Sequence, residues 1–169
     1  CPAARAPLRP GERAGRARAA RPAPIAPPAS PAAGSMFTGW SGVCAGTGVC
    51  IATMNQARTI TATFTEIQAP LVAITAPVPS IISTCGTGIY ITASATDNVG
   101  VASVDFTIYT VPAHTLVYSS TDVTAPYSAG TDFLTDGDYI LEVTATDTSG
   151  NTAVDTKAFN TIFDVGMCA

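Results

Sequence analysis

The chain is 169 residues long with a formal net charge of −4; 47% of its residues are hydrophobic and only 12% are charged, against about 25% charged in an average globular protein. The single His excludes catalysis that needs several imidazole ligands. No run approaches the roughly 18 apolar residues of a membrane span, and the length allows one or two small domains.

Residues 1–35 form a tract rich in Arg, Pro and Ala, with six of the eight basic residues, one acid and eight of the 13 Pro. This tract carries +5 and the rest of the chain carries −9. Its only branched aliphatic residues are Leu8 and Ile25, too few to bury a core, so we predict a disordered segment. No aromatic residue is interleaved for base stacking, which favours a linker or a non-native leader over a nucleic-acid arm or a membrane patch.

From residue 36 onward, short alternating runs of Thr, Ser, Val, Ala and Ile stand between turn residues, which predicts an all-β fold. Residues 59–64 alternate strictly, with Ile60, Ala62 and Phe64 on one face and threonines on the other. This is the pattern of a half-buried strand.

A Gly-rich spacer of five residues separates Cys44 from Cys50. Such a spacer lets the chain fold back so that the two sulfurs meet, which predicts a β-hairpin closed by a disulfide within residues 36–65. A metal site is disfavoured because neither a His nor a further Cys lies nearby.

Residues 66–169 are predicted to be a second domain, a β-sandwich of about seven strands separated by turn signals. The expected strands are Leu71–Ile74, Ile89–Thr96, Val101–Tyr109, Thr115–Ser119, Tyr127–Phe133, Tyr139–Thr146 and Ala153–Phe163. Alternation assigns the inward positions of three of them: Ile89, Ile91, Ala93 and Ala95; Val104, Phe106 and Ile108; Tyr139, Leu141, Val143 and Ala145. The turn at 136–139 is predicted to be a tyrosine corner, in which the Tyr139 hydroxyl bonds back to the preceding turn.

Two stretches resemble known families. The run FTGWSGVCAGTGVCIATMNQARTITATF, residues 37–64, resembles the C-terminal half of the divergent internalin-type B-repeat of bacterial surface proteins. Residues 70–165 are similar to bacterial Ig-like domains through the phrases ATDNVGVASVDF (95–106), TAPYS (124–128) and DGDYILEVTATDTSGNTA (136–153).

The resemblance implies a structural or adhesive module that works outside the bacterial cell or on its surface, beside neighbouring domains of a longer protein. A carbohydrate or a host surface is a further expected partner. The alternative is an accessory polysaccharide-binding domain of a large secreted hydrolase. Exposed aromatic residues would favour that alternative, and the outward candidates Tyr90 and Tyr109 are too few to decide.

Catalysis has little support in the sequence. The lone His114 lies in a loop without a positioned nucleophile, and Asp136 and Asp138 share one tight turn instead of facing each other across a cleft. Gly46 and Gly48 lie between two cysteines and not between a strand and a helix, so they do not form a phosphate loop. We therefore expect a protein that is not an enzyme.

The Ig-like topology places the residue before the second strand and the residue after the last strand at one pole of the sandwich. Cys85 and Cys168 occupy these two places, so they are candidates for a second disulfide. A loop of about 80 residues closed in this way contributes roughly 4 kcal/mol in the chain-entropy model.

The loops at the opposite pole contain Asp97 and Asn98 after one strand and Asp147 after another, and Glu66 arrives nearby on the linker. Oxygen ligands of this kind suit Ca²⁺, so these four residues are the candidate calcium site. The alternative is that Asp97 and Asp147 only accept backbone N–H bonds that shape their turns. No other cofactor is expected.

Overall fold

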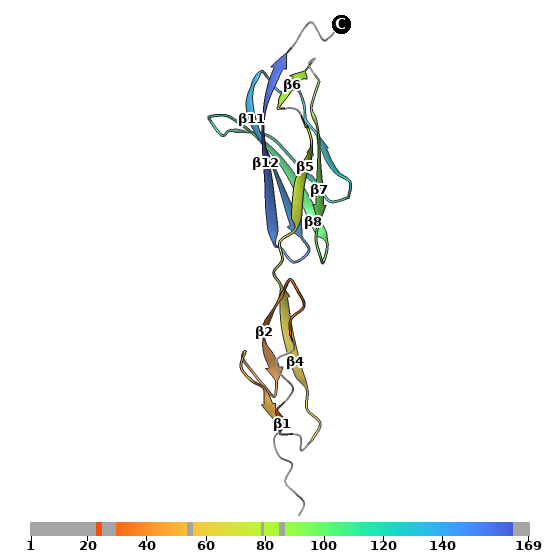
Figure 1. Ribbon diagram of the computed structural model, residues 1–169, viewed down its shortest axis with the longest axis vertical. Helices are drawn as coiled ribbons and strands as arrows, with labels where there is room; N and C mark the ends of the chain where they lie inside the picture. The colour runs from red at the N-terminus through yellow and green to blue at the C-terminus, as the bar shows by residue number, and fades with distance from the viewer. Residues whose placement is uncertain (1–22, 25–29, 54–55, 79, 85–86, 164–169) are drawn as a thin grey trace, which may run out of the picture. The chain divides into compact units, whose positions relative to one another are not determined.

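The computed structural model describes residues 23–24, 30–53, 56–78, 80–84 and 87–163, and all regular structure in these ranges is β-strand (Figure 1). The chain divides into two compact units. One comprises Phe37–Thr63 with Cys1–Ser30, and the other comprises Phe64–Ala169 with Pro31–Met36. The strands are β1 (Ala23–Pro24), β2 (Ser35–Gly42), β3 (Ile51–Ala52), β4 (Ile60–Glu66), β5 (Leu71–Ala76), β6 (Ile81–Thr84), β7 (Tyr90–Thr96), β8 (Val101–Thr110), β9 (Leu116–Asp122), β10 (Tyr127–Gly130), β11 (Gly137–Asp147) and β12 (Thr152–Phe163).

Two small sheets build the first part of the chain: β2 pairs with β4, and β1 pairs with β3. The loop after β2 returns to its own strand, because the Trp40 amide donates to the Gly46 carbonyl and the Trp40 indole Nε1 donates to the Gly48 carbonyl, at 2.9 and 3.0 Å. Gly42 is required at the turn: its φ is +98°, and a Cβ there would lie 2.3 Å from the Thr59 carbonyl oxygen.

The predicted disulfide of this hairpin is confirmed. Cys44 and Cys50 are bonded, with their Cα atoms 5.6 Å apart, and Cys50 is buried. The prediction of disorder for residues 1–35 falls mostly outside the described residues. Within the described part of that tract, β1 pairs antiparallel with β3, and Ala23 lies opposite Ala52.

The second unit contains a β-sandwich of two sheets with strand orders β10-β7-β5 and β6-β12-β11-β8-β9. Between β5 and β6 the chain crosses from the three-stranded sheet to the five-stranded sheet. There β6 pairs parallel with β12. Two side chains of β12 bond to β5 and to the segment after it. Asp155 Oδ2 accepts the Ile74 amide at 2.8 Å, and Lys157 Nζ donates to the Val78 carbonyl at 2.9 Å.

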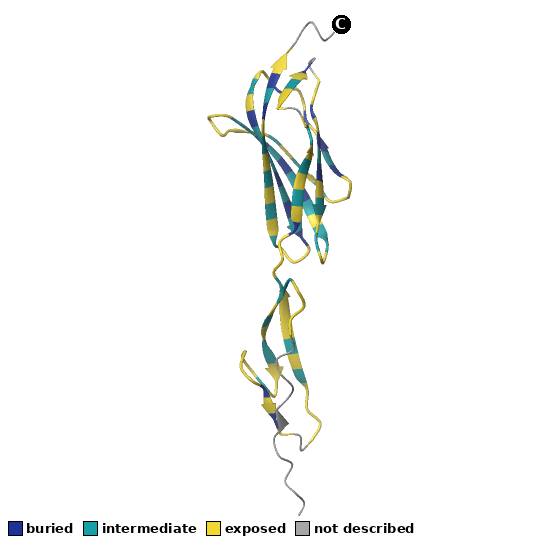
Figure 2. Cartoon of the chain, viewed as in Figure 1, coloured by how far each residue is buried: buried dark blue, intermediate teal, exposed yellow. Residues whose placement is uncertain are grey.

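The core lies between these sheets, and the faces predicted by alternation are confirmed (Figure 2). Every predicted inward residue of β8 and β11 is at most 5% exposed. On β7, Ile91 is 1% exposed while its neighbour Tyr90 is 65% exposed. Leu141 is fully buried at the position where antibody domains place a cysteine, so packing holds the centre of this core.

The tyrosine corner is also present. The Tyr139 hydroxyl donates to the Thr135 carbonyl at 2.9 Å, while its ring stacks on Phe159 with the centroids 5.6 Å apart. The Thr135 carbonyl accepts a second bond, 2.6 Å long, from the hydroxyl of the fully buried Thr161. These bonds fix the start of β11 against β12.

Candidate functional site

The turns that carry the predicted Asp97 and Asp147, after β7 and β11, meet at one pole of the sandwich. The Thr148 amide donates to the Gly100 carbonyl at 3.0 Å, which ties the two turns together. Asp147 closes its own turn: Oδ1 accepts the amides of Ser149 and Asn151 at 2.7 and 2.8 Å. Only 2% of Asp147 is exposed.

Glu66 reaches the same place through Asn151. The Asn151 side-chain amide donates to Glu66 Oε2 at 2.5 Å and to Asp147 Oδ2 at 2.8 Å. The other Glu66 oxygen accepts the Gln68 amide at 2.6 Å. The two carboxylates therefore share one neutral donor. Sequence reasoning missed Asn151, because nothing in the local pattern shows that its side chain bridges Glu66 and Asp147.

The pKa of Asp147 is the balance of opposing effects. Burial raises it, whereas hydrogen bonds from the Asn151 side chain and from the backbone amides of Asn151, Ser149 and Gly150 lower it. The hydrogen bonds together dominate, and the pKa of Asp147 lies below its ordinary value of 3.8. Asp147 is therefore ionised at neutral pH.

Asp97 shapes the other turn, with Oδ2 accepting the amides of Val99 and Gly100 at 2.8 and 3.1 Å. Its Oδ1 is buried and has no hydrogen-bond partner among the described residues. Asn98 is exposed next to it. Within the described ranges, no three His, Cys, Asp or Glu side chains form a group that could hold a metal ion. The calcium site stays a prediction. The alternative, that Asp97 and Asp147 shape their turns, requires backbone N–H bonds to both carboxylates, and these bonds are present.

The remaining candidate residues lie elsewhere. His114 is exposed in the β8–β9 turn with a φ of +51°, and its ring stacks on Tyr109 with the centroids 4.4 Å apart. Within the described part of the chain, the imidazole makes no hydrogen bond that would orient it as a base. Cys85 and Cys168 lie outside the described residues.

The outer face of the five-stranded sheet carries an open hollow of about 470 Å³. It lies over β11 and β12, between the end of β8 and the segment that precedes β6. The residues lining it are Ser80, Val111, Asp138, Tyr139, Ile140, Ala158, Phe159 and Asn160. No sequence pattern indicated it.

The fold defines the second unit as an Ig-like β-sandwich, and the comparisons with known proteins agree. Residues 70–145 match the family model of the bacterial Ig domain, and residues 25–68 match that of the divergent InlB B-repeat domain. The chain thus contains a bacterial Ig domain preceded by a divergent B-repeat, as the resemblances predicted. The B-repeat match begins at residue 25, earlier than the predicted residue 37.

Solved structures are also similar to this chain. The fibronectin(III)-like modules of CbhA from Clostridium thermocellum are 28% identical, with 56% of this chain and 99% of that chain covered and a TM-score of 0.47. Murine CRIg is 11% identical, with 57% and 99% covered and a TM-score of 0.38. The comparison with curated proteins found no match. In the described ranges, no helix has the length and apolar character needed to cross a bilayer.

Proposed function

We propose that the chain is a non-catalytic structural spacer of a secreted or cell-surface bacterial protein. The families that match its two parts typically occur in surface or secreted proteins. Their presence side by side in one chain supports a modular protein in which this segment connects other parts.

The observation that carries this proposal is where the chain enters and leaves the sandwich. Leu71, at the start of β5, lies opposite Thr96, at the end of β7, whereas Phe163 ends β12 opposite Thr84. Entry and exit are therefore at opposite ends of the sandwich (Figure 1). A domain connected in this way separates the segments before and after it by its whole length, about 40 Å for the twelve residues of β12.

Location is tested on intact bacteria that express the complete gene. Brief protease treatment of whole cells, followed by mass spectrometry, should release peptides from residues 64–163. Recovery of these peptides only after lysis, beside a cytosolic marker protein, would contradict a surface or secreted location. The complete coding sequence then separates a spacer from an accessory domain, because tandem copies favour the former and an attached catalytic domain favours the latter.

The absence of catalysis is tested on the purified 169-residue chain. Ester, glycoside and peptide substrates should all be turned over at background rates. Turnover that disappears in His114→Ala would overturn this part of the proposal, because it would show that the imidazole acts as a base.

A further inference from the structure

The hollow on the outer face of the five-stranded sheet has an apolar floor. Ile140 lies directly opposite Ala158 on β12 and opposite Tyr109 on β8, so the three side chains share one cross-strand row. Their face is the outer one, because the neighbouring Tyr139 and Phe159 are buried in the core. Val111, which is 42% exposed, extends this apolar surface beyond the end of β8.

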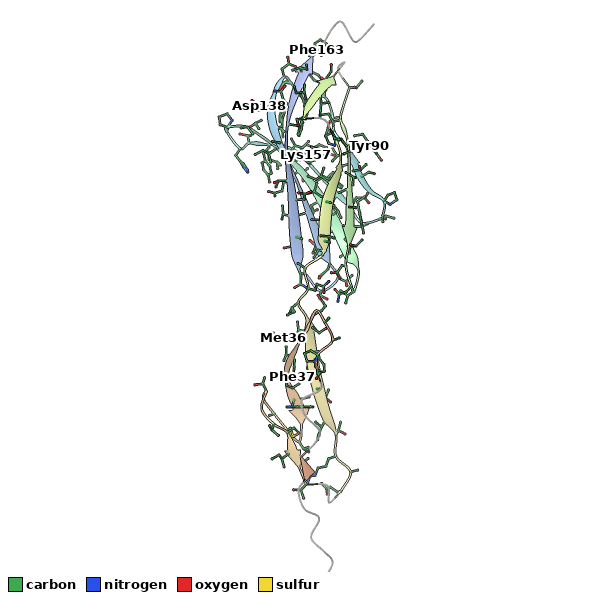
Figure 3. The ribbon with its side chains drawn as sticks, in the orientation of Figure 1. Met36, Phe37, Tyr90, Asp138, Lys157 and Phe163 are labelled. Atoms are coloured by element: carbon green, nitrogen blue, oxygen red, sulfur yellow. A yellow bond between two sulfur atoms is a disulfide. The ribbon has the colours of Figure 1, made fainter. Side chains whose placement is uncertain are left out.

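The next cross-strand row supplies a polar rim. Asp138 lies opposite Asn160, and the Asn160 side-chain amide donates to Asp138 Oδ1 at 2.9 Å and to the Gly137 carbonyl at 3.1 Å. Asp138 Oδ2 and Asn160 Oδ1 accept no hydrogen bond from any described residue, and the Ser80 hydroxyl lies on the same lining. Figure 3 labels Asp138, which lies near the start of β11. A ligand at this rim must therefore supply hydrogen-bond donors.

Charge excludes one class of such ligands. Residues 64–169 contain eleven Asp and Glu against a single basic residue, Lys157, whose Nζ is bonded to the Val78 carbonyl. The field around this domain is negative and repels anions. Phosphates, sulfates and uronic-acid polymers are consequently poor ligands for the hollow.

The combination fits a sugar ring. A pyranose presents an apolar face of C–H groups and a rim of hydroxyl donors, which complement the Ile140 floor and the acceptors of Asp138 and Asn160. Tyr109, stacked with His114, places an aromatic ring beside the floor for further contact with C–H groups. The volume of about 470 Å³ is within the range of small-ligand sites, roughly 300–1,000 Å³.

We propose that this hollow binds a hexose unit of a neutral polysaccharide. Binding here does not depend on the spacer role, because the site lies on the side of the sandwich and leaves both of its ends available for connection.

The test uses the full chain labelled with ¹⁵N and titrated with cellohexaose, mannohexaose and hexagalacturonate up to roughly 10 mM, a range that captures weak affinities. At least one neutral hexasaccharide should shift the amide signals of Val111, Ile140 and Asn160, and hexagalacturonate should not. Ala158→Arg places a long side chain in the hollow from an exposed position and should weaken binding by at least about tenfold.

Thr152→Arg is the matched control, because it adds the same charge to an exposed position on the same face of β12 at its other end. This variant should bind like the wild type. The proposal is overturned if neither neutral hexasaccharide shifts these signals, if Thr152→Arg weakens binding as much as Ala158→Arg, or if hexagalacturonate binds equally well. An aliphatic peptide that binds the hollow in place of both neutral sugars would also overturn it.

Discussion

The tyrosine corner offers a quantitative test of what holds β11 against β12. Tyr139→Phe removes the hydroxyl that donates to the Thr135 carbonyl and leaves the buried ring on Phe159 in place. Because that carbonyl keeps its bond from Thr161, it is not orphaned. The Thr135 hydroxyl, 3.1 Å from the Tyr139 hydroxyl, also loses a partner, but Thr135 is exposed and water can replace it, so the expected cost stays near that of one neutral hydrogen bond, about 1 kcal/mol. For a domain of this size the melting temperature should fall by about 4–8 °C.

Thermal and urea unfolding followed by circular dichroism measure this loss. Tyr118→Phe is the control, because its hydroxyl donates to the Gly130 carbonyl at 3.1 Å in an exposed position and should contribute less than about 0.5 kcal/mol. If Tyr139→Phe leaves the melting temperature unchanged, the corner contributes nothing and our reasoning is wrong.

A double-mutant cycle tests the shared acceptor directly. Thr161→Val removes the other hydroxyl bonded to the Thr135 carbonyl, and the double variant leaves that carbonyl without either partner. The double variant should lose roughly 1 kcal/mol more than the sum of the single losses, because both bonds to this carbonyl are partly buried and an acceptor left without a partner there costs more than a missing bond. Strict additivity would show that water replaces the lost donors.

Three further outcomes are expected. Because the pKa of Asp147 is lowered in the folded state, its contribution to stability is complete above its ordinary value of 3.8 and is lost as the pH falls through the lower folded value. The melting temperature of the wild type should thus fall more steeply below about pH 4 than that of Asp147→Asn. Millimolar Ca²⁺ should give no calorimetric heat and no rise in melting temperature, because the Asp147 oxygens already accept N–H bonds; a heat that Asp97→Asn/Asp147→Asn abolishes would establish the ion instead. Gly88→Ala should cost about 1–3 kcal/mol in urea unfolding, because a Cβ there would lie 1.6 Å from the Thr131 carbonyl oxygen, and an unchanged midpoint would contradict that contact.

The sequence predicted those parts of the fold that depend on local alternation. Phe106 and Leu141 lie in strands whose predicted inward residues are all apolar or aromatic, so a period of two fixes their faces. Residues 81–84 were not predicted as a strand, because they are short, lack alternation and depend on parallel pairing with β12, far along the chain. Residues 131–133 were predicted to continue β10, but the strand ends at Gly130, and Phe133 packs edge-on against Phe163.

Local patterns likewise predicted one part of the candidate site and could not predict another. The turns at Asp97 and Asp147 were recognisable because each follows a strand and precedes residues that favour turns. The bridge from Asn151 to Glu66 joins residues 85 positions apart, and the hollow exists only because Ile140 and Ala158 meet in register. Both depend on tertiary pairing, which local patterns do not encode.

The parallel pairing of β6 with β12 determines how the sandwich responds to force. When tension is applied at the start of β5 and at the end of β12, β6 and β12 are pulled past each other along their length. The ladder from Asn160 to Phe163 is then sheared, and its bonds must break together and not in succession. Asp155 accepts the Ile74 amide of β5, and Lys157 donates to the Val78 carbonyl between β5 and β6, so both add hydrogen bonds to the same boundary. We therefore expect this ladder to raise the force needed to unfold the domain when it is stretched along the direction in which its chain is connected.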